Sequence, residues 1–111
     1  MKARRAPTRL AGHDRSMIVG SLEVTLRLHG VRSLKEKRSI RQSLLSKMRS
    51  GFKLAAAETD DQDTWDALTV GIAAVGPHRG PVQQVLRDAA DYIANGDYGE
   101  VLDERIEIER Y

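Results

Sequence analysis

Residues 18–28 alternate between apolar side chains and other side chains, and this pattern constrains the fold more than any other feature of the chain. The apolar residues that share one face are Ile18, Leu22, Val24, Leu26 and Leu28. A period of two over this length predicts a β-strand with one buried face. Gly30 follows and is expected to end the strand. Other elements must therefore cover one face of the sheet to which this strand belongs.

A helix is predicted directly after this strand. Ser33 and Glu36 have the spacing of a capping box, in which the serine hydroxyl accepts the Glu36 amide and the glutamate carboxylate reaches back to the Ser33 amide. We expect a helix from residue 34 to about residue 50, ended by Gly51. Its buried stripe is expected to contain Ile40, Leu44, Leu45 and Met48.

The remaining patterns predict two more strands, a second helix and a last strand. The strands are expected over residues 52–58, 67–75 and about 100–110, and the helix over residues 81–95, with Pro81 at its first position. The inward residues expected on the second and last strands are Phe52, Leu54, Ala56, Leu102, Ile106 and Ile108.

The resulting order is strand, helix, strand, strand, helix, strand. Right-handed crossovers over one sheet face leave few arrangements for this order. We expect an α+β, ferredoxin-like βαββαβ two-layer sandwich, with antiparallel sheet order 4-1-3-2 and both helices on one face. Residues 17–111 would form this single domain. Residues 1–16 are predicted to be a disordered basic extension, with Met17 as an alternative start of the protein.

Charge is distributed very unevenly along the chain. Residues 1–16 carry five basic and one acidic side chain, a net of +4. Residues 27–53 carry nine basic and one acidic, a net of +8, and residues 54–111 carry four basic and thirteen acidic, a net of −9. The first half of the predicted domain is therefore suited to an anion, unless the two halves neutralise each other on folding.

In this topology the start of the first helix and the turn after the second strand lie at the same end of the sheet. The basic run and the acidic run are thus predicted to be neighbours. An expected anion or nucleic-acid site contains Ser33, Lys35, Lys37, Arg38 and Arg41, supported by an acidic hairpin with Glu58, Asp60, Asp63 and Trp65. Two alternatives remain open at this point: Lys37 and Arg38 pair internally with the hairpin, or they serve a ligand at the helix N-terminus.

Several function classes find no support in the sequence. The chain has no cysteine, which excludes thiolate catalysis and cysteine-ligated metals. No nucleophile–base pair, phosphate loop, metal-ligand spacing or cofactor motif is present, so we expect neither an enzyme nor a bound cofactor or metal. No apolar run is long enough to span a membrane and no secretory signal is present, which predicts a cytoplasmic protein.

The predicted open face of the sheet carries small or polar side chains and no aromatic residue. The residues expected there are Ser21, Glu23, Thr25 and Arg27 on the first strand and Ala67, Thr69, Gly71 and Ala73 on the third. Base stacking on the sheet, as in RNA-recognition domains, is therefore not expected. A flat face of small residues suggests instead a homo-oligomer interface.

Three segments of the chain resemble a known family. They are Met17-Ile18-Val19-Gly20 at the start of the first predicted strand, Ser33-Leu34-Lys35-Glu36-Lys37-Arg38, and the later run from Glu58 through Asp60 and Gln62-Asp63 to Trp65. All three are similar to the YlxP-like family, a bacterial family classed as a domain of unknown function. The resemblance covers about residues 17–109 and implies a small ferredoxin-like fold in a bacterial cytoplasmic protein. Its members often lie in gene neighbourhoods with translation initiation and ribosome-maturation factors, which implies a ribosome-associated role. The family supplies no catalytic residue.

Three functions are compatible with these observations. The first is a non-enzymatic accessory protein that associates with RNA or the ribosome through its basic first helix, with Lys47 and Arg49 extending the contact to phosphates. The second is an oligomeric regulatory module that binds a small anionic ligand. The third, less favoured, is a metal-dependent hydrolase that uses the acidic hairpin.

Overall fold

Four strands and two long helices follow one another along residues 16–111, which are the residues that the computed structural model describes. The elements are β1 (Ile18–Leu28), α1 (Leu34–Ser46), a π-helical turn η1 (Lys47–Gly51), β2 (Ala55–Asp60), β3 (Ala67–Gly76), α2 (Arg79–Asn95) and β4 (Gly99–Arg110). The predicted order of strands and helices is confirmed. The extension predicted over residues 1–16 lies outside the described residues, except for Ser16.

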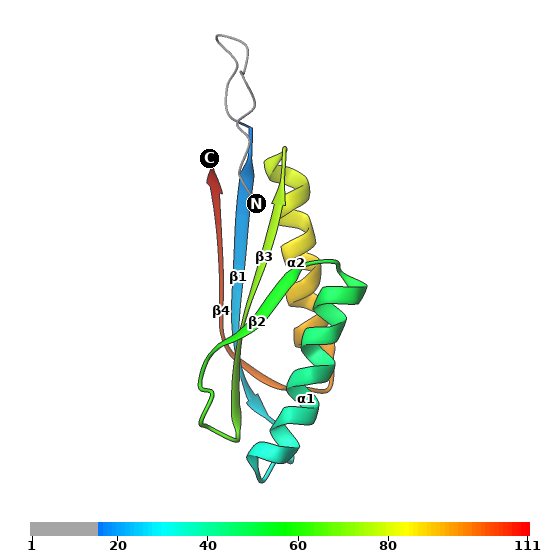
Figure 1. Cartoon of the computed structure of the whole chain (residues 1–111), viewed down its shortest axis with the longest axis vertical. Helices are drawn as coiled ribbons and strands as arrows, with labels where there is room; N and C mark the ends of the chain where they lie inside the picture. Colours follow the sequence, from blue (N-terminus) through cyan, green and yellow to red (C-terminus); the bar gives the residue numbers. More distant parts are fainter. Residues whose placement is uncertain (1–15) are drawn as a thin grey trace, which may run out of the picture.

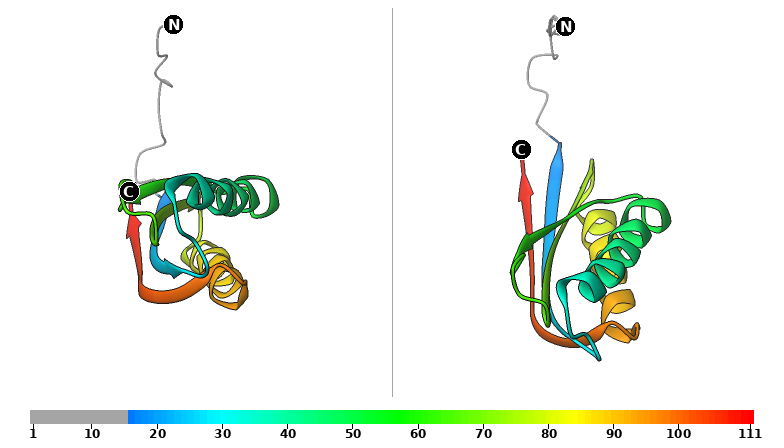
Figure 2. Two further views of the ribbon diagram at one scale, coloured as in Figure 1. Left: turned by 90° about the horizontal axis from the view of Figure 1, so that it is seen from below. Right: turned by 60° about the horizontal axis from the view of Figure 1, so that its bottom comes forward.

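The strands form one antiparallel sheet in the order β2-β3-β1-β4. Read from the opposite edge this is 4-1-3-2, as the sequence predicts. Both helices cover the same face of the sheet, and the other face stays open (Figures 1 and 2). The ferredoxin-like two-layer fold is therefore confirmed. No helix in residues 16–111 is both long and apolar enough to cross a lipid bilayer.

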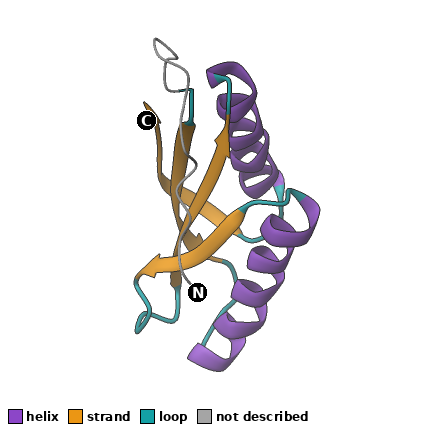
Figure 3. Cartoon of the chain, turned by 45° about the horizontal axis from the view of Figure 1, so that its top comes forward, coloured by secondary structure: helices purple, strands orange, loops and turns teal. Residues whose placement is uncertain are grey.

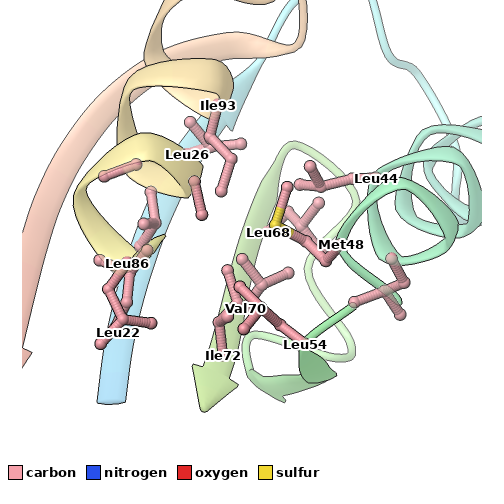
Figure 4. Packing of buried hydrophobic residues seen from close by; sticks show 14 of the residues in the cluster. Leu22, Leu26, Leu44, Met48, Leu54, Leu68, Val70, Ile72, Leu86 and Ile93 are labelled. Atoms are coloured by element: carbon pink, nitrogen blue, oxygen red, sulfur yellow. The ribbon is translucent and has the colours of Figure 1, made fainter. Parts of the chain in front are cut away.

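The hydrophobic core lies between the sheet and the two helices (Figure 4). The alternation in residues 18–28 is confirmed, because all five apolar residues of its predicted inward face are buried. Helix α2 contributes Val82, Leu86, Ala89, Ala90 and Ile93 to the core. Helix α1 contributes fewer apolar side chains, and one of its buried residues is Lys37.

The first helix ends differently from the prediction. Its last turn widens into η1, in which the Phe52 amide donates to the Lys47 carbonyl (3.1 Å) and the Leu54 amide donates to the Met48 carbonyl (3.0 Å). Lys53, between them, has a positive φ of 60°. The amides of residues 52 and 54 bond back to the helix, so the strand predicted from Phe52 begins only at Ala55. It ends at Asp60 instead of Glu58.

The inward face of the last strand is predicted correctly at Ile106 and Ile108 and wrongly at Leu102. Leu26 is paired with Val101 and Thr25 with Asp103, so Leu102 is an extra residue in a β-bulge. The bulge reverses the alternation. Leu102 is 48% exposed, and Val101 packs against the core in its place.

Candidate functional site

The start of α1 and the turn between β2 and β3 lie at the same end of the molecule (Figure 3), as the topology predicts. Lys37 joins them: its Nζ donates to the carbonyl oxygens of Asp61 (2.6 Å) and Thr64 (2.7 Å). Because Lys37 comes from α1 and both acceptors come from the turn, these bonds fix the helix against the hairpin. The predicted meeting of the basic and acidic runs is confirmed.

Lys37 is the most deeply buried charged residue among those described, with 0% exposure. Besides its two carbonyl acceptors, its Nζ lies 2.8 Å from Oε2 of Glu58. This contact is an ion pair by distance, without the alignment of a hydrogen bond, because Oε2 has no hydrogen-bond partner. A buried ammonium group needs such partners to offset its loss of water. For Lys37 the internal alternative holds, and its charge does not reach the surface.

Glu58 points toward the helices because it lies opposite Val70, a residue of the buried sheet face. Its Oε1 accepts a hydrogen bond from Nη1 of Arg41 at 3.2 Å. One carboxylate is therefore shared by two cations of α1, one buried and one partly exposed. The two ion pairs attach α1 to β2 through this single side chain.

The predicted capping box at the start of α1 is confirmed in one half and corrected in the other. The Ser33 hydroxyl accepts the Glu36 amide at 3.1 Å, as predicted. The Glu36 carboxylate, however, accepts the amide of Arg32 at 2.8 Å instead of that of Ser33. A carboxylate of the chain itself thus lies at the positive end of the helix dipole, the position that a bound anion would take.

The turn of the hairpin is built on Asp61, which has a positive φ of 60°. Aspartate tolerates this conformation better than most residues. The Asp61 carbonyl also accepts the Thr64 amide (3.0 Å), and its Oδ2 accepts the hydroxyl of Thr69 at 2.6 Å. Thr69, predicted on the open face, is therefore only 3% exposed, because the hairpin folds over that end of the face. This role of Asp61 was not predicted from the sequence.

The remaining predicted site residues are not drawn into this network. Lys35 and Arg38 are exposed, and no hydrogen bond or ion pair links their side chains to another residue in 16–111. Trp65 is 44% exposed at the hairpin, and Asp63 is exposed beside it. Asp60 accepts the amide of its neighbour Asp61 at 2.7 Å.

The two cations predicted to extend the contact surface have structural partners. The Lys47 ammonium lies 5.2 Å from the centre of the Tyr92 ring, a cation–π contact that links η1 to α2. Arg49 donates from Nε (3.1 Å) and Nη2 (2.6 Å) to the carbonyl of Ala56. Ala56 belongs to the edge strand β2, so Arg49 covers part of the open edge of the sheet.

Glu23 organises a second polar cluster, on the open face, which sequence reasoning did not find. Its Oε2 accepts the Thr59 hydroxyl (2.9 Å) and its Oε1 accepts Nη2 of Arg105 (2.7 Å). The hydrogen bond from Thr59, and then that from Arg105, hold the pKa of Glu23 below its usual range. Only strand register brings the three residues together, so no local motif could have revealed them.

The hydrolase alternative would need several carboxylates around a metal. Within residues 16–111 no three His, Asp or Glu side chains gather closely enough to hold one. In the hairpin, Glu58 faces two cations and Asp61 binds Thr69. Glu58 therefore serves the attachment of α1, and Asp61 serves the turn.

Comparison with known proteins places the chain in a family. Residues 19–106 match the family model described as a protein of unknown function, DUF503. The chain is also 30% identical over 76 residues to the uncharacterized protein YlxP of Bacillus subtilis (strain 168), an alignment that covers 68% of this chain and 83% of that protein.

Two designed proteins have a similar shape. These are the de novo designed proteins Foldit4 (TM-score 0.46, 9% identity, 86% of this chain and 96% of that one) and Ferredog-Diesel (TM-score 0.40, 9% identity, 96% and 99%). The fold assignment itself rests on the sheet order and the placement of the helices described above. By the family model and the YlxP match together, the chain belongs to the DUF503 family of proteins of unknown function.

Proposed function

We propose that this protein is a non-enzymatic cytoplasmic accessory protein that binds RNA, free or in the ribosome, through the outer side of α1. One observation carries the proposal: Lys35 and Arg38 are exposed and have no ionic partner within residues 16–111, whereas Lys37 and Arg41 share Glu58. Residues three apart on a helix lie on the same side. The two free cations therefore form one surface.

Phosphate contacts suit this surface better than base contacts. Lysine and arginine on a helix neutralise phosphates, which gives affinity without reading sequence. The open face of the sheet offers no aromatic side chain from β1 or β3 on which a base would stack. We therefore expect recognition by shape and charge, with strong dependence on salt.

The hairpin has a supporting role in this proposal. Glu58, Asp61 and Thr64 hold Lys37, which fixes the start of α1 on the sheet. A fixed helix presents Lys35 and Arg38 with little loss of conformational freedom on binding. The acidic residues thus position the basic surface without touching the nucleic acid.

The test is filter binding of the full chain to a structured RNA hairpin across a salt series. The double variant Lys35→Glu/Arg38→Glu is expected to lose affinity by at least about tenfold and to lower the salt slope by about 2. Lys53→Glu/Arg79→Glu is the matched control, because it makes the same change of charge at the opposite end of β3.

A second arm removes residues 1–16, which carry a net charge of +4. Binding by α1 predicts that most of the affinity remains. Affinity that disappears with residues 1–16, or that is equal in the two double variants, would refute the proposal.

A homo-oligomer through the open face is a second candidate. A shallow hollow on this face is lined by small residues, among them Ser21, Ala57, Gly71 and Ala73. Small side chains let the backbone of a second copy approach closely. Sedimentation velocity of the chain and of Ala73→Glu tests it: a dimer that the substitution dissociates supports the candidate, and a monomer at all concentrations removes it.

A further inference from the structure

Strand β3 continues beyond the start of its neighbour β2 (Figure 1). Its last residues pair with β1 on one side, in the register Ala74 with Gly20, Val75 with Val19 and Gly76 with Ile18. On the other side the pairing with β2 stops at Ala55 and Ala73. The edge of β3 over residues 74–76 therefore has no strand beside it among residues 16–111. An unpaired strand edge is a template for another strand.

A groove of about 690 Å³ runs along this free edge. Phe52 and Leu54 line it on the side of η1, and Val82 and Val85 line it on the side of α2. Val75, on the edge itself, is 66% exposed, the highest value among the large hydrophobic residues that stand out at the surface. A groove of this size falls within the usual range of ligand sites, and its apolar lining suits apolar side chains of a bound segment.

The charge around the groove has one sign. Its ionisable lining residues are Lys53 and His78, and Arg79 follows His78 in the chain. All three are exposed, no acidic residue lines the groove, and none of the three has an ion-pair partner within residues 16–111. The basic segment 1–16 of this chain, with its net charge of +4, is therefore a poor occupant.

A second copy of the chain is also disfavoured. A twofold interface at this groove would bring the same patch of each subunit together, and so would place Lys53 and Arg79 of one copy near the same two cations of the other. Like charges across an interface are unfavourable. The groove calls for a segment that is extended, carries apolar side chains at alternate positions and is acidic at its ends.

We propose that residues 74–76 and the adjoining groove bind an extended acidic peptide segment of a partner protein, which adds to the sheet as a strand beside β3. Backbone hydrogen bonds to the free edge would supply affinity, and the apolar groove and the cations would select the sequence. This site is separate from the basic side of α1. The ten residues of β3 place the two ends of the strand about 30 Å apart, at about 3.3 Å per residue.

The test uses the full chain and a labelled synthetic peptide of about eight residues, with valine or isoleucine at alternate positions and two glutamates at each end. Fluorescence anisotropy measures its affinity. A peptide with lysines in place of the glutamates is the charge control. Lys53→Glu/Arg79→Glu is expected to weaken binding of the acidic peptide by at least about tenfold. Lys35→Glu/Arg38→Glu, the matched variant at the other end, is expected to leave it unchanged.

Methylation of the peptide amides separates strand addition from simple apolar binding. In an added strand, alternate amides face β3 and the others face solvent. Methylating one alternate set should abolish binding, while methylating the other set should have little effect. The backbone amide resonances of residues 74–76 should shift on binding of the unmodified peptide.

Three outcomes would overturn the proposal. One is no binding of the acidic peptide up to about 1 mM. Another is equal binding of the acidic and the basic peptide, or equal effects of the two methylated sets. The last is a dimer in sedimentation that Lys53→Ala/Arg79→Ala strengthens, because removing the like charges would favour a second copy in the groove. RNA binding by α1 is measured separately and is unaffected by any of these outcomes.

Discussion

The two ends of β3 differ in how the surrounding chain closes them. At the hairpin end, Lys37 crosses from α1 to bind two carbonyls of the turn, and the hairpin folds over Thr69. At the other end β2 has not yet begun, and β3 borders an apolar groove with no strand beside it in the described part of the chain. Polar contacts cover the hairpin end of the strand, whereas an apolar groove borders the other end and leaves its edge free.

This difference shows how the fold can keep one surface rigid and another available. Closing the hairpin end requires charged groups inside the protein, each held by a partner, because an unpaired buried charge is costly. The groove end needs no such network, since apolar side chains tolerate exposure at a smaller cost each. The closed end presents the cations of α1 in a fixed geometry, and the open end keeps a strand edge free.

The strongest test of the closed end is Lys37→Met, which keeps the length of the side chain and removes its charge. The variant leaves Glu58 with only Arg41, it removes the lysine donor from the Thr64 carbonyl, and it leaves the Asp61 carbonyl with only the Thr64 amide. We expect a loss of about 3–5 kcal/mol in the free energy of unfolding, the usual cost of breaking a buried ion pair. Urea denaturation measures it.

The control for this prediction is Lys35→Met, an exposed lysine on the same helix, which should change stability by less than about 0.5 kcal/mol. Adding Glu58→Gln to Lys37→Met removes the carboxylate charge that has lost its buried partner and should recover part of the loss. If Lys37→Met is as stable as the unmodified chain, the hairpin end is not held by this lysine.

The apolar part of α1 is tested by Leu44→Ala. Leu44 is fully buried in the core, so its truncation removes apolar contacts and leaves a cavity. We expect a loss of about 2–5 kcal/mol, as for other buried leucines. The same measurement on Val75→Ala, at the exposed edge by the groove, should show a much smaller change. Equal losses would mean that the groove end is packed as tightly as the core.

Hydroxyl chemistry near the closed end gives a prediction for alkaline pH. Burial, together with the hydrogen bond from the Tyr98 hydroxyl to that of Tyr92 (3.2 Å), raises the pKa of Tyr98 to about 12. A raised pKa in the folded state favours the protonated form. Its contribution to stability is therefore complete below about pH 10, the ordinary value, and is lost as the pH rises toward about 12.

Absorbance titration of the tyrosines checks this value. Tyr92→Phe removes the hydrogen bond and should lower the pKa of Tyr98. The pKa should stay above its ordinary value, because burial is the larger cause. A midpoint for Tyr98 at the ordinary value in the unmodified chain would contradict the burial of its hydroxyl and the hydrogen bond to Tyr92.

Most of the fold could be predicted because its signals are local. The alternation of residues 18–28, the Ser33–Glu36 cap and the spacing of α2 each act within one element, and topology then places the basic and acidic runs together. The misjudged positions depend on interactions beyond one element. Phe52 is a residue type that is common in strands, but its amide donates to a carbonyl of η1. Leu102 points outward because the pairing of β4 with β1 contains a bulge at this residue.

The sequence predicted where the basic and acidic runs meet, but it predicted only part of which residues pair with each other. The sequence shows which cations cluster, but not which of them a carboxylate will meet. Glu58 takes Lys37 and Arg41 because it lies opposite Val70 on the buried face, a fact of register. Lys35 and Arg38 have no ion-pair partner within residues 16–111, because they lie on the exposed side of the helix, away from Glu58. A run of basic residues in the sequence therefore predicts where a basic surface lies, and the packing of the folded chain determines which of these residues can contact a partner.

The smallest predicted effect concerns Glu23, which lies on the open face between the two ends. Thr59 and Arg105 stabilise its charged form and lower its pKa, with the hydroxyl of Thr59 as the larger cause. A lowered pKa gives stability that is present above the ordinary value of 4.5 and is lost as the pH falls through the folded value. Thr59→Val should therefore raise the pKa of Glu23 toward 4.5, as NMR titration of its carboxyl carbon would show. Because Glu23 is not deeply buried, the change in stability should be small, and the substitution should leave both RNA binding and peptide binding unchanged.

A Glu23 pKa that stays the same in Thr59→Val would mean that Arg105 alone holds the carboxylate. The polar cluster would then belong to β1 and β4, with no link to the edge strand β2.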